Sequence, residues 1–351
     1  MGPRPQPEMQ PSISSEIPSS EIPPAVTVII PTLAADETLA ECLASLDRQT
    51  FSDFEVIVVD NSGRCAVEPR EHMRLIANKT NMGFGAAFNQ GFRDSKSPFL
   101  AVLNDDAVAG PRWLEALLAA VEARPDVGMC ASQVRLADDG RLDSTGMLLC
   151  PDGSSKQRGH LESPESFSRR QEALLPSGSA AFYRREMLDE IGLFDEAFFL
   201  YCEDTDLGLR ARWAAWECLY VPDAVVEHRY SHSAGQASAL KAFYVERNRL
   251  FLAVKNLPVP ELLLAPFYSV ARYFWHFVFA TQGRGKAAEF RRAGNSPQQL
   301  PLVVLRAHLE LFRHLPTLWK KRRGIKRRFT SKQFRRLIRR FSITPRQVAA
   351  L

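Results

Sequence analysis

Short apolar runs rich in valine and isoleucine alternate with helical patterns in the first third of the chain, and this alternation restricts the fold more than any other feature. Such runs occupy residues 26–30, 54–59, 73–77 and 99–103. Between the first two, residues 37–49 place their leucines at the spacing of one helical face. Apolar strands separated by amphipathic helices are typical of a parallel sheet covered on both faces. The sequence therefore predicts an α/β domain with a Rossmann-like, mostly parallel sheet flanked by helices.

Polar residues follow three of the predicted strands directly. The carboxyl ends of parallel strands lie at one edge of a sheet, where doubly wound sheets bind their ligands. We therefore expect these residues to line one crevice. They are Pro31 and Thr32 with Asp36, then Asp60, then Asn104, Asp105 and Asp106.

A second acidic cluster, Glu203-Asp204-Thr205-Asp206, follows another apolar run, and His228 lies further along the chain. A divalent cation that carries a diphosphate would explain the carboxylates of the first cluster. Proton removal from a nucleophile would explain those of the second. The structural alternative is that acidic residues favour the first turn of a helix, with Asp206 paired to Arg210 one turn on. Together the two clusters indicate transfer from a nucleotide-activated donor.

The cysteines and the N-terminal residues indicate a reducing compartment. The six cysteines are scattered without a CxxC pair, which favours free, buried thiols over disulfides. Residues 1–24 are rich in Pro, Ser and Glu and contain no apolar run, so they are expected to be a disordered lead-in rather than a secretory signal. The sequence thus predicts a cytoplasmic protein.

The charge is distributed unevenly along the chain. Residues 313–351 contain 14 lysines and arginines and no acidic residue, which leaves 31 of the 45 basic residues against all 40 acidic ones elsewhere. A basic tail on an acidic body suggests an anionic partner surface. Upstream, residues 262–280 are apolar and aromatic but are interrupted by Pro266, Arg272 and His276. We predict that residues 258–351 form a helical, aromatic and basic region that docks on an anionic membrane surface, at the inner face of the cell membrane; a buried helical core is the alternative.

Two other classes of protein fit the sequence less well. A dinucleotide-dependent dehydrogenase needs a glycine-rich turn directly after its first strand, where this chain has Pro31 and Thr32. A nucleic-acid-binding protein could use the basic tail, but the tail offers few aromatic side chains for stacking on bases. We therefore expect no nucleic-acid partner.

Seven segments, read in order, resemble the family 2 glycosyltransferases of the GT-A fold, and within them a rhamnosyltransferase-like subgroup. They span about residues 26–257, which predicts a GT-A catalytic domain at residues 25–257. The segments are VTVIIPT, FEVIVVDNSG, NMGFGAAFNQG, FLAVLNDDAV, LPSGSAAFYRRE, GLFDEAFFLYCEDTDLGLRAR and VVEHRYSHSAG.

The resemblance implies a set of residues that hold the donor nucleotide. Asp60 would accept hydrogen bonds from the base or ribose, although Asp also occupies turns, and Asp36 could equally cap the following helix. The loop at residues 81–85 would lie beside the donor, with Asn89 pointing at it, unless it is simply a tight turn. The donor set implied is Pro31, Thr32, Asp36, Asp60, Asn81, Gly83, Gly85, Asn89, Asn104 and Asp105.

The resemblance also implies a metal site, a general base and an acceptor loop. Asn104-Asp105-Asp106 takes the place of the DxD signature, so Asp106 and His228 would hold Mg²⁺ or Mn²⁺ with the diphosphate and water. Asp204 would take the proton from the acceptor hydroxyl, and Glu203 would position the acceptor. Ser177, Gly178 and Ser179 would line the acceptor side, or form a plain turn into the next helix. Arg247 or Arg249 could face a diphosphate.

These residues together predict an inverting glycosyltransferase. The expected donor is a nucleoside-diphosphate sugar, dTDP-L-rhamnose first. The expected acceptor is a hydroxyl of a glycan or of a polyprenyl-diphosphate-linked sugar in cell-envelope polysaccharide synthesis. The alternatives are a UDP-sugar-dependent enzyme of the same family and a nucleotide-sugar-binding pseudoenzyme.

Overall fold

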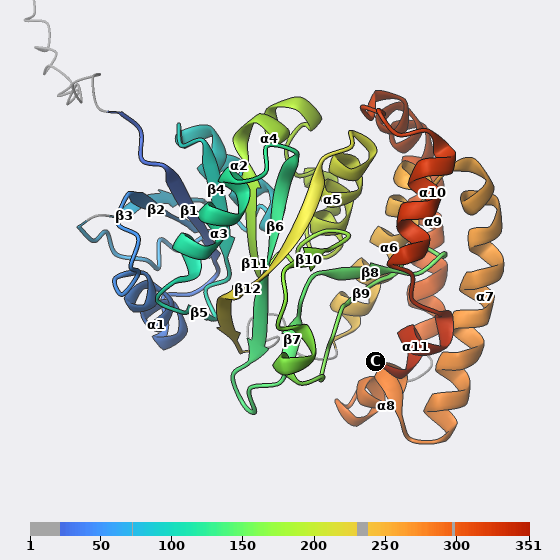
Figure 1. Ribbon diagram of the computed structural model, residues 1–351. Helices are drawn as coiled ribbons and strands as arrows, with labels where there is room; N and C mark the ends of the chain where they lie inside the picture. The colour runs from blue at the N-terminus through green and yellow to red at the C-terminus, as the bar shows by residue number, and fades with distance from the viewer. Residues whose placement is uncertain (1–21, 72, 230–237, 297–298) are drawn as a thin grey trace, which may run out of the picture.

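A mixed sheet forms the centre of the part of the chain up to residue 228 (Figure 1). The computed structural model describes residues 22–71, 73–229, 238–296 and 299–351, so most of the predicted lead-in at residues 1–24 lies outside the described residues. The strands of the described ranges are β1 (Val26–Thr32), β2 (Phe54–Asp60), β3 (Met73–Ala77), β4 (Phe99–Leu103), β5 (Ala107–Ala109), β6 (Val127–Leu136), β7 (Leu142–Ser144), β8 (Met147–Leu149), β9 (Ser155–Gln157), β10 (Gln171–Glu172), β11 (Ala180–Arg184) and β12 (Glu217–His228).

The main path of the sheet has the order β10-β12-β6-β11-β4-β1-β2-β3. Strands β1, β2, β3 and β4 pair in parallel, as the sequence predicts. Strand β11 lies antiparallel between β4 and β6, and β12 runs parallel to β6. The reversed strand β11 follows directly on residues 177–179, which were predicted to line the acceptor side or to turn into the next helix. The hairpin of β8 and β9 forms a separate small sheet.

Helices cover both faces of the sheet because side chains along a strand alternate between its two faces. Val26, Val28 and Ile30 of β1 join one core, while Ile29 joins the other. Helices α1 (Glu37–Leu46) and α3 (Trp113–Glu122) supply leucines and Trp113 to the first core. Helices α2 (Phe84–Asp94), α4 (Arg185–Ile191) and α5 (Glu203–Trp213) supply the second.

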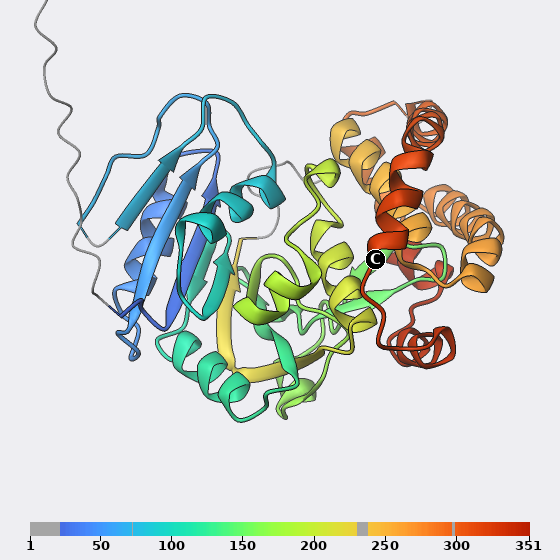
Figure 2. The same cartoon turned by 90° about the horizontal axis from the view of Figure 1, so that it is seen from above.

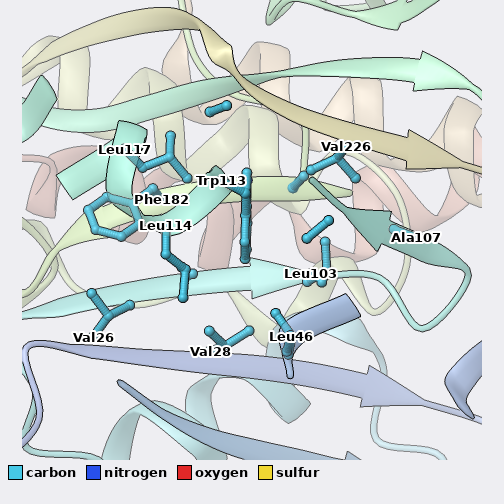
Figure 3. Close-up of a cluster of buried hydrophobic side chains, with 14 of the residues drawn as sticks. Val26, Val28, Leu46, Leu103, Ala107, Trp113, Leu114, Leu117, Phe182 and Val226 are labelled. Carbon is cyan, nitrogen blue, oxygen red and sulfur yellow. The ribbon is translucent and has the colours of Figure 1, made fainter. Parts of the chain in front are cut away.

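The close-up in Figure 3 shows the first core, in which Trp113 lies with Phe182 among aliphatic side chains. Trp113 is fully buried among the valines of β1 and Leu103 of β4. Its indole nitrogen donates a hydrogen bond of 2.9 Å to the Ser132 hydroxyl, so the polar atom of this buried ring is satisfied. Packing of this kind fixes the strands, and therefore the positions of the residues at their carboxyl ends.

The C-terminal helices gather at one side of the sheet domain (Figures 1 and 2). They share a core with α5, in which the Trp213 ring stacks on Phe334 with centroids 3.8 Å apart. The basic tail is therefore packed on the sheet domain through apolar side chains such as Leu337 and Ile338. These helices are α6 (Ala239–Asn256), α7 (Val259–Thr281), α8 (Gly285–Arg292), α9 (Gln299–Gly324), α10 (Ser331–Arg340) and α11 (Pro345–Ala350).

Helix α7 contains the aromatic segment predicted to contact lipid, and it has two different faces. One face buries Ala265, Ser269 and Arg272 against the rest of the C-terminal region. The opposite face exposes a stripe of large apolar side chains: Leu263, Phe267, Val270, Phe274 and Phe277. Among the described residues, no helix has both the length and the apolarity needed to cross a bilayer.

Candidate active site

The carboxyl ends of β1, β2 and β4 meet at one edge of the sheet, as predicted. Thr32 and Asp60 are register partners at the ends of β1 and β2. The Thr32 hydroxyl donates a hydrogen bond of 2.6 Å to Asp105, which follows β4. Burial raises the pKa of Asp105 to about 6, helped by the charges of Asp106 and Asp36 and opposed by the Thr32 hydrogen bond. The first acidic cluster is thus tied to the end of the first strand, next to Pro31.

The carboxylates of Asp60 and Asp36 both accept hydrogen bonds from backbone N–H groups a few residues further along the chain. Asp60 is fully buried and accepts hydrogen bonds from the backbone N–H groups of Ser62 (2.8 Å) and Val67 (3.1 Å). Burial alone would raise the pKa of Asp60, but the hydrogen bonds from Ser62 and Val67 outweigh it and lower the pKa. Asp36 is the N-cap of α1, with its carboxylate accepting from the backbone of Thr38 at 3.1 Å. Both residues therefore have the structural use that the sequence analysis named as the alternative, at positions that border the crevice.

The glycine loop at residues 81–85 packs against the chain before α5. Gly83 has φ +86°, and a β-carbon there would lie 2.4 Å from the carbonyl oxygen of Phe199. The backbone N–H of Phe84 donates to that same oxygen at 3.0 Å. Asn81 accepts a hydrogen bond of 2.8 Å from the Gly83 N–H. A β-carbon on Gly85 would lie 2.9 Å from Phe194. Close packing on residues 194–199 therefore accounts for both glycines without a ligand.

Asn89 does not have the orientation that the sequence analysis expected. Its amide group donates to the Phe194 carbonyl and to Glu196, each at 2.9 Å, and accepts from the Phe194 N–H at 3.1 Å. The side chain is buried, and these bonds use its hydrogen-bonding capacity. Asn89 thus holds the segment before α5 instead of pointing at the crevice.

Asn104, Asp106 and His228 meet where β12 ends beside β5. His228 Nε2 lies 3.1 Å from Asp106 Oδ1 and 3.3 Å from the Asn104 amide nitrogen. On the other side of the ring, Nδ1 lies 3.0 Å from Asp143 Oδ2. Burial disfavours the imidazolium ion, but the carboxylates of Asp106 and Asp143 raise the pKa of His228 to about 9. A hydrogen bond from Nδ1 to Asp143 orients the ring so that Nε2 faces Asp106.

Asp143, on β7, is the residue of this group that the sequence analysis missed. It is buried, and it also contacts His160, whose Nδ1 lies 3.3 Å from Asp143 Oδ1. Burial alone would raise the pKa of Asp143, but the two histidines lower it. Carboxylates that hold the far nitrogen of a metal-binding histidine are a common feature of metal sites. Asp143 belongs to the three-residue strand β7, which pairs with β6. A strand this short has no recognisable sequence pattern, so the sequence gives no sign of Asp143.

Asp106 and His228 fit a divalent cation. Adjacent ligands of an octahedral ion with bonds of roughly 2.1 Å lie about 3 Å apart, and Asp106 Oδ1 lies 3.1 Å from His228 Nε2. Asp106 Oδ1 is buried and faces the His228 ring nitrogen. In the part of the chain that the structure describes, no group of three or more acidic, histidine or cysteine side chains could enclose an ion. Such a pair suits a cation whose remaining ligands are a diphosphate and water.

Glu203 and Asp204 begin helix α5. The Asp204 carboxylate accepts hydrogen bonds from the backbone N–H groups of Gly178 (3.0 Å) and Thr205 (2.5 Å), and it is partly exposed. Burial raises the pKa of Asp204, against these hydrogen bonds. Burial and the adjacent Asp204 charge raise the pKa of Glu203 to about 8. The pair thus combines a half-buried carboxylate with a neighbour that is neutral at pH 7, an arrangement suited to general acid–base chemistry.

The loop Ser177-Gly178-Ser179 joins this pair to the first acidic cluster. Gly178 contacts Asp204 as described, and the Ser179 carbonyl accepts a hydrogen bond of 2.9 Å from the Asn104 N–H. The two serine hydroxyls lie 3.0 Å apart. The predicted acceptor loop therefore lies between the candidate metal site and the candidate base. This three-residue loop contacts both.

The chain before α5 is strained. Phe199, Tyr201 and Cys202 have φ values of 63°, 70° and 66°, a conformation that costs non-glycine residues about 1–3 kcal/mol each. The Asn248 amide holds this segment by donating to the carbonyl oxygens of residues 198, 200 and 201 at 2.9, 2.8 and 2.7 Å. Asn248 lies on α6 and was not singled out in the sequence. It fixes the entry into the helix that begins with Glu203 and Asp204.

The arginines beside Asn248 do not face the crevice. Arg249 is buried against Glu246, Asp152 and Ser269 within the C-terminal region. Arg247 donates to the carbonyl oxygens of residues 197 and 198. The expectation that one of them faces a diphosphate is wrong for Arg249, because its hydrogen bonds are all made inside the protein.

Asp206, two residues after Asp204, has a purely structural environment. It is fully buried, and its carboxylate accepts from Arg210 (2.9 Å), Lys255 (2.8 Å) and Asn256 (2.8 Å). Although burial alone would raise the pKa of Asp206, the cations Lys255 and Arg210 lower it. The predicted pairing with Arg210 is confirmed.

The pKa of Glu203 gives a test of this environment. An acid with a folded-state pKa of about 8 holds its proton when the unfolded chain has lost it, so the free energy of unfolding falls as pH rises from about 4.5 to 8. Glutamine cannot ionise, so the Glu203→Gln variant does not lose free energy of unfolding at this position as the pH rises. We expect the variant to be more stable than the wild type by on the order of 1–3 kcal/mol at pH 8, with no such gain at pH 4.5. Urea unfolding at both pH values measures this, with the exposed Glu186→Gln as control; an equal difference at both pH values would contradict it.

Comparisons with known proteins identify the family and the fold. The model of the family "Glycosyltransferase like family 2" matches residues 23–250. The N-acetylglucosaminyl-diphospho-decaprenol L-rhamnosyltransferase of Mycobacterium tuberculosis is 31% identical over 259 residues, which cover 65% of this chain and 84% of that protein. An uncharacterised glycosyltransferase of Bacillus subtilis is 28% identical over 61% of this chain and 77% of its own length.

Two solved structures share the fold. The crystal structure of GalNAc-T7 with UDP, GalNAc and Mn²⁺ superposes with a TM-score of 0.53 at 15% identity, covering 67% of this chain and 48% of that one. A mannosyltransferase from Pyrobaculum calidifontis in complex with GDP-Man and Mn²⁺ gives 0.50 at 17% identity over 88% of each chain. The chain has the GT-A fold, belongs to glycosyltransferase family 2 as a rhamnosyltransferase-like member, and is a glycosyltransferase.

Proposed function

We propose that this enzyme transfers L-rhamnose from dTDP-L-rhamnose, with inversion, to a hydroxyl group of a lipid-linked glycan in cell-envelope polysaccharide synthesis. The observation that carries the proposal is the loop at residues 177–179, which contacts Asp204 on one side and Asn104 on the other. It brings a partly buried carboxylate close to a pair of residues suited to a divalent cation. The choice of rhamnose and of a lipid-linked acceptor rests on the similarity to the mycobacterial enzyme.

Asp204 is the proposed general base. Its carboxylate is partly exposed, is held by two backbone N–H groups and has a raised pKa, so it can take a proton near neutral pH. The acceptor hydroxyl, once deprotonated, attacks the anomeric carbon from the face opposite the nucleoside diphosphate, and the configuration inverts. Glu203, neutral at pH 7, can donate a hydrogen bond to the acceptor sugar.

The donor would lie along the ends of β1, β2 and β4. Thr32 and Asp105 form one side, Asp60 and Asn81 border the nucleotide end, and Asp106 with His228 would hold Mg²⁺ or Mn²⁺. When bound, the cation would stabilise the charge of the leaving diphosphate. Asp143 would keep Nε2 of His228 directed at the cation.

A donor panel tests the proposal. The protein is incubated with dTDP-L-rhamnose and with UDP- and GDP-sugars, in Mn²⁺ and with a prenyl-diphosphate-linked N-acetylglucosamine as acceptor, and the lipid product is analysed. We expect product from dTDP-L-rhamnose only. Product from a UDP-sugar alone would favour the UDP-sugar-dependent alternative. Nucleotide binding without product from any donor would favour the pseudoenzyme.

We further propose that the enzyme works at the inner face of the cell membrane. The exposed stripe on α7 is matched by a second on α9, where Leu302, Leu305, Leu309 and Phe312 are exposed. Apolar helix faces flanked by lysines and arginines bind the headgroup region of anionic membranes. Removing the chain from Arg313 onward cannot test this, because Leu318, Phe334 and Phe341 belong to the shared core.

Point substitutions on α7 test membrane docking without disturbing that core. Phe267 and Phe274 are 73% and 57% exposed, so Phe267→Asp with Phe274→Asp should fold normally. We expect binding to anionic vesicles to weaken by about tenfold or more, because two large apolar side chains no longer enter the lipid. Co-sedimentation measures it, with the exposed Leu161→Asp as control. Unchanged vesicle binding at low salt would contradict the proposal.

A further inference from the structure

A strained turn lies in the chain directly before helix α5. The Phe198 carbonyl accepts a hydrogen bond of 2.7 Å from the N–H of Leu200, two residues further on. Phe199, between them, has φ 63° and ψ −59°. These values define a γ-turn of the rare, strained form. Because Tyr201 and Cys202 also have positive φ, most of this short segment has a backbone conformation that is unfavourable for residues with a β-carbon.

Two neighbouring side chains of α6 bind the carbonyl oxygens of this segment. The Asn248 amide nitrogen donates to the carbonyls of residues 198, 200 and 201 at 2.9, 2.8 and 2.7 Å. Arg247 donates to those of residues 197 and 198 at 2.9 and 2.8 Å. The Asn248 amide oxygen accepts from Arg247 Nε at 2.8 Å, so the two side chains also bind each other. Asn248 is fully buried, and both of its polar atoms are used.

Helix α5 has no side-chain cap that would fix where and how it starts. Its N-cap residue is Cys202, whose side chain makes no capping hydrogen bond. The usual N-cap residues accept a hydrogen bond from the first helical turn and so fix the start of the helix. Since α5 lacks this contact, the direction of its first turn, which carries Glu203 and Asp204, depends on the residues immediately before it.

Two further contacts hold the same segment, but they lie further from the base. The Phe199 ring stacks on the Tyr244 ring with centroids 5.3 Å apart, and the Phe199 carbonyl accepts from the Phe84 N–H at 3.0 Å. The Asn248 bond to the carbonyl of residue 201 lies three residues before Asp204. A shift of this carbonyl would therefore move Asp204 relative to the acceptor loop at residues 177–179.

We propose that Asn248 is a positioning residue of the transfer reaction, which holds the strained turn so that the Asp204 carboxylate meets the acceptor hydroxyl. The inference rests on the proposed function, because it takes Asp204 as the base. Asn248 itself contacts only carbonyl groups and Arg247, so it takes no part in the proton transfer. Without its amide, residues 199–202 can relax toward ordinary backbone angles, and the first turn of α5 follows them.

Replacing Asn248 by Ala should lower kcat by about 100-fold, the effect expected when a reacting group is displaced by about 1 Å. The affinity for the nucleotide should be nearly unchanged, because Asn248 binds the segment before the base and not the ends of β1, β2 and β4. Single-turnover transfer, with the donor that gives product in the donor panel, and nucleotide titration measure the two quantities. If the alanine variant does not fold, Asn248→Ser keeps one hydroxyl donor and should show a smaller loss of kcat.

Asn256→Ala is the matched control. Asn256 lies on the same helix, is also fully buried, and donates its amide to Asp206 at 2.8 Å. Its loss should reduce thermal stability as the loss of Asn248 does, but it should leave kcat nearly unchanged, because Asn256 does not bind the strained turn. An equal loss of kcat in both variants would show that Asn248 acts only through stability.

A double-mutant cycle with Asp204→Asn separates positioning from a general structural effect. Once the base is gone there is no carboxylate to position, so adding Asn248→Ala should lower kcat by roughly twofold at most. A further loss of about 100-fold would overturn the inference, as would full kcat in a folded Asn248→Ala variant, and leave Asp204 as the base. Full kcat in Asp204→Asn alone would instead overturn the proposed base, and this inference with it.

Discussion

Replacing Asp204 by Asn should lower the transfer rate by about 10²–10⁴-fold, the range that general base catalysis contributes. An amide cannot take the proton from the acceptor hydroxyl, whereas it can still accept the hydrogen bond from Gly178. Donor binding should be nearly unchanged, because Asp204 lies on the acceptor side of the loop at residues 177–179. Single-turnover transfer and nucleotide titration measure the two quantities separately.

Asp206→Asn is the matched control, since it changes a carboxylate of the same helix two residues after Asp204. Burial raises the pKa of Asp204, so its charge opposes folding, and Asp204→Asn should leave the fold stable. The Asp206 charge is instead stabilised by Lys255 and Arg210, so its loss should reduce thermal stability. Substantial turnover by Asp204→Asn would show that the base lies elsewhere.

Replacing Asp106 by Ala should remove most of the increase in nucleotide affinity that Mn²⁺ provides. Asp106 and His228 are the two proposed protein ligands and lie 3.1 Å apart, so losing Asp106 leaves His228 as the single proposed protein ligand. Asp143→Asn should have a smaller effect, about 10–100-fold in metal affinity, because it only orients His228. Titration of dTDP with Mn²⁺ and with chelator measures both.

Glu41→Gln is the control for these metal-site variants. Glu41 pairs with Arg229, next to His228, but it is not among the candidate ligands. Its removal should leave the effect of Mn²⁺ unchanged. If Asp106→Ala keeps the full effect of Mn²⁺, the cation is held by other residues, and the assignment of Asp106 and His228 is wrong.

The sequence predicts the parallel part of this fold well. Strands β1, β2, β3 and β4 are short and largely apolar in sequence, and the polar residues after β1, β2 and β4 meet at one edge as expected. Strand β11 was not predicted, because its residues AAFYR carry no signal for antiparallel pairing between distant strands. The helical C-terminal region was predicted, but its packing on Trp213 depends on contacts between residues far apart in the sequence.

In the candidate site, too, contacts between residues far apart in the sequence could not be predicted. Motifs point to Asp106, His228 and Asp204, which the structure brings to one side of the sheet. The residues that hold them, Asp143 and Asn248, lie on a short strand and a distant helix, and only the folded chain shows these contacts. The prediction that Asn89 points at the donor is wrong because its hydrogen-bond partners, Phe194 and Glu196, lie more than a hundred residues further along the chain.

The most direct test of the account is calorimetric titration of the full chain with dTDP, UDP and GDP, each in Mn²⁺ and in chelator. We predict tight binding of dTDP that depends on Mn²⁺, and weak binding of the other two. Metal-independent binding would contradict the role of Asp106 and His228. Binding of none of the three nucleotides would contradict the central claim that this site holds a nucleoside-diphosphate sugar.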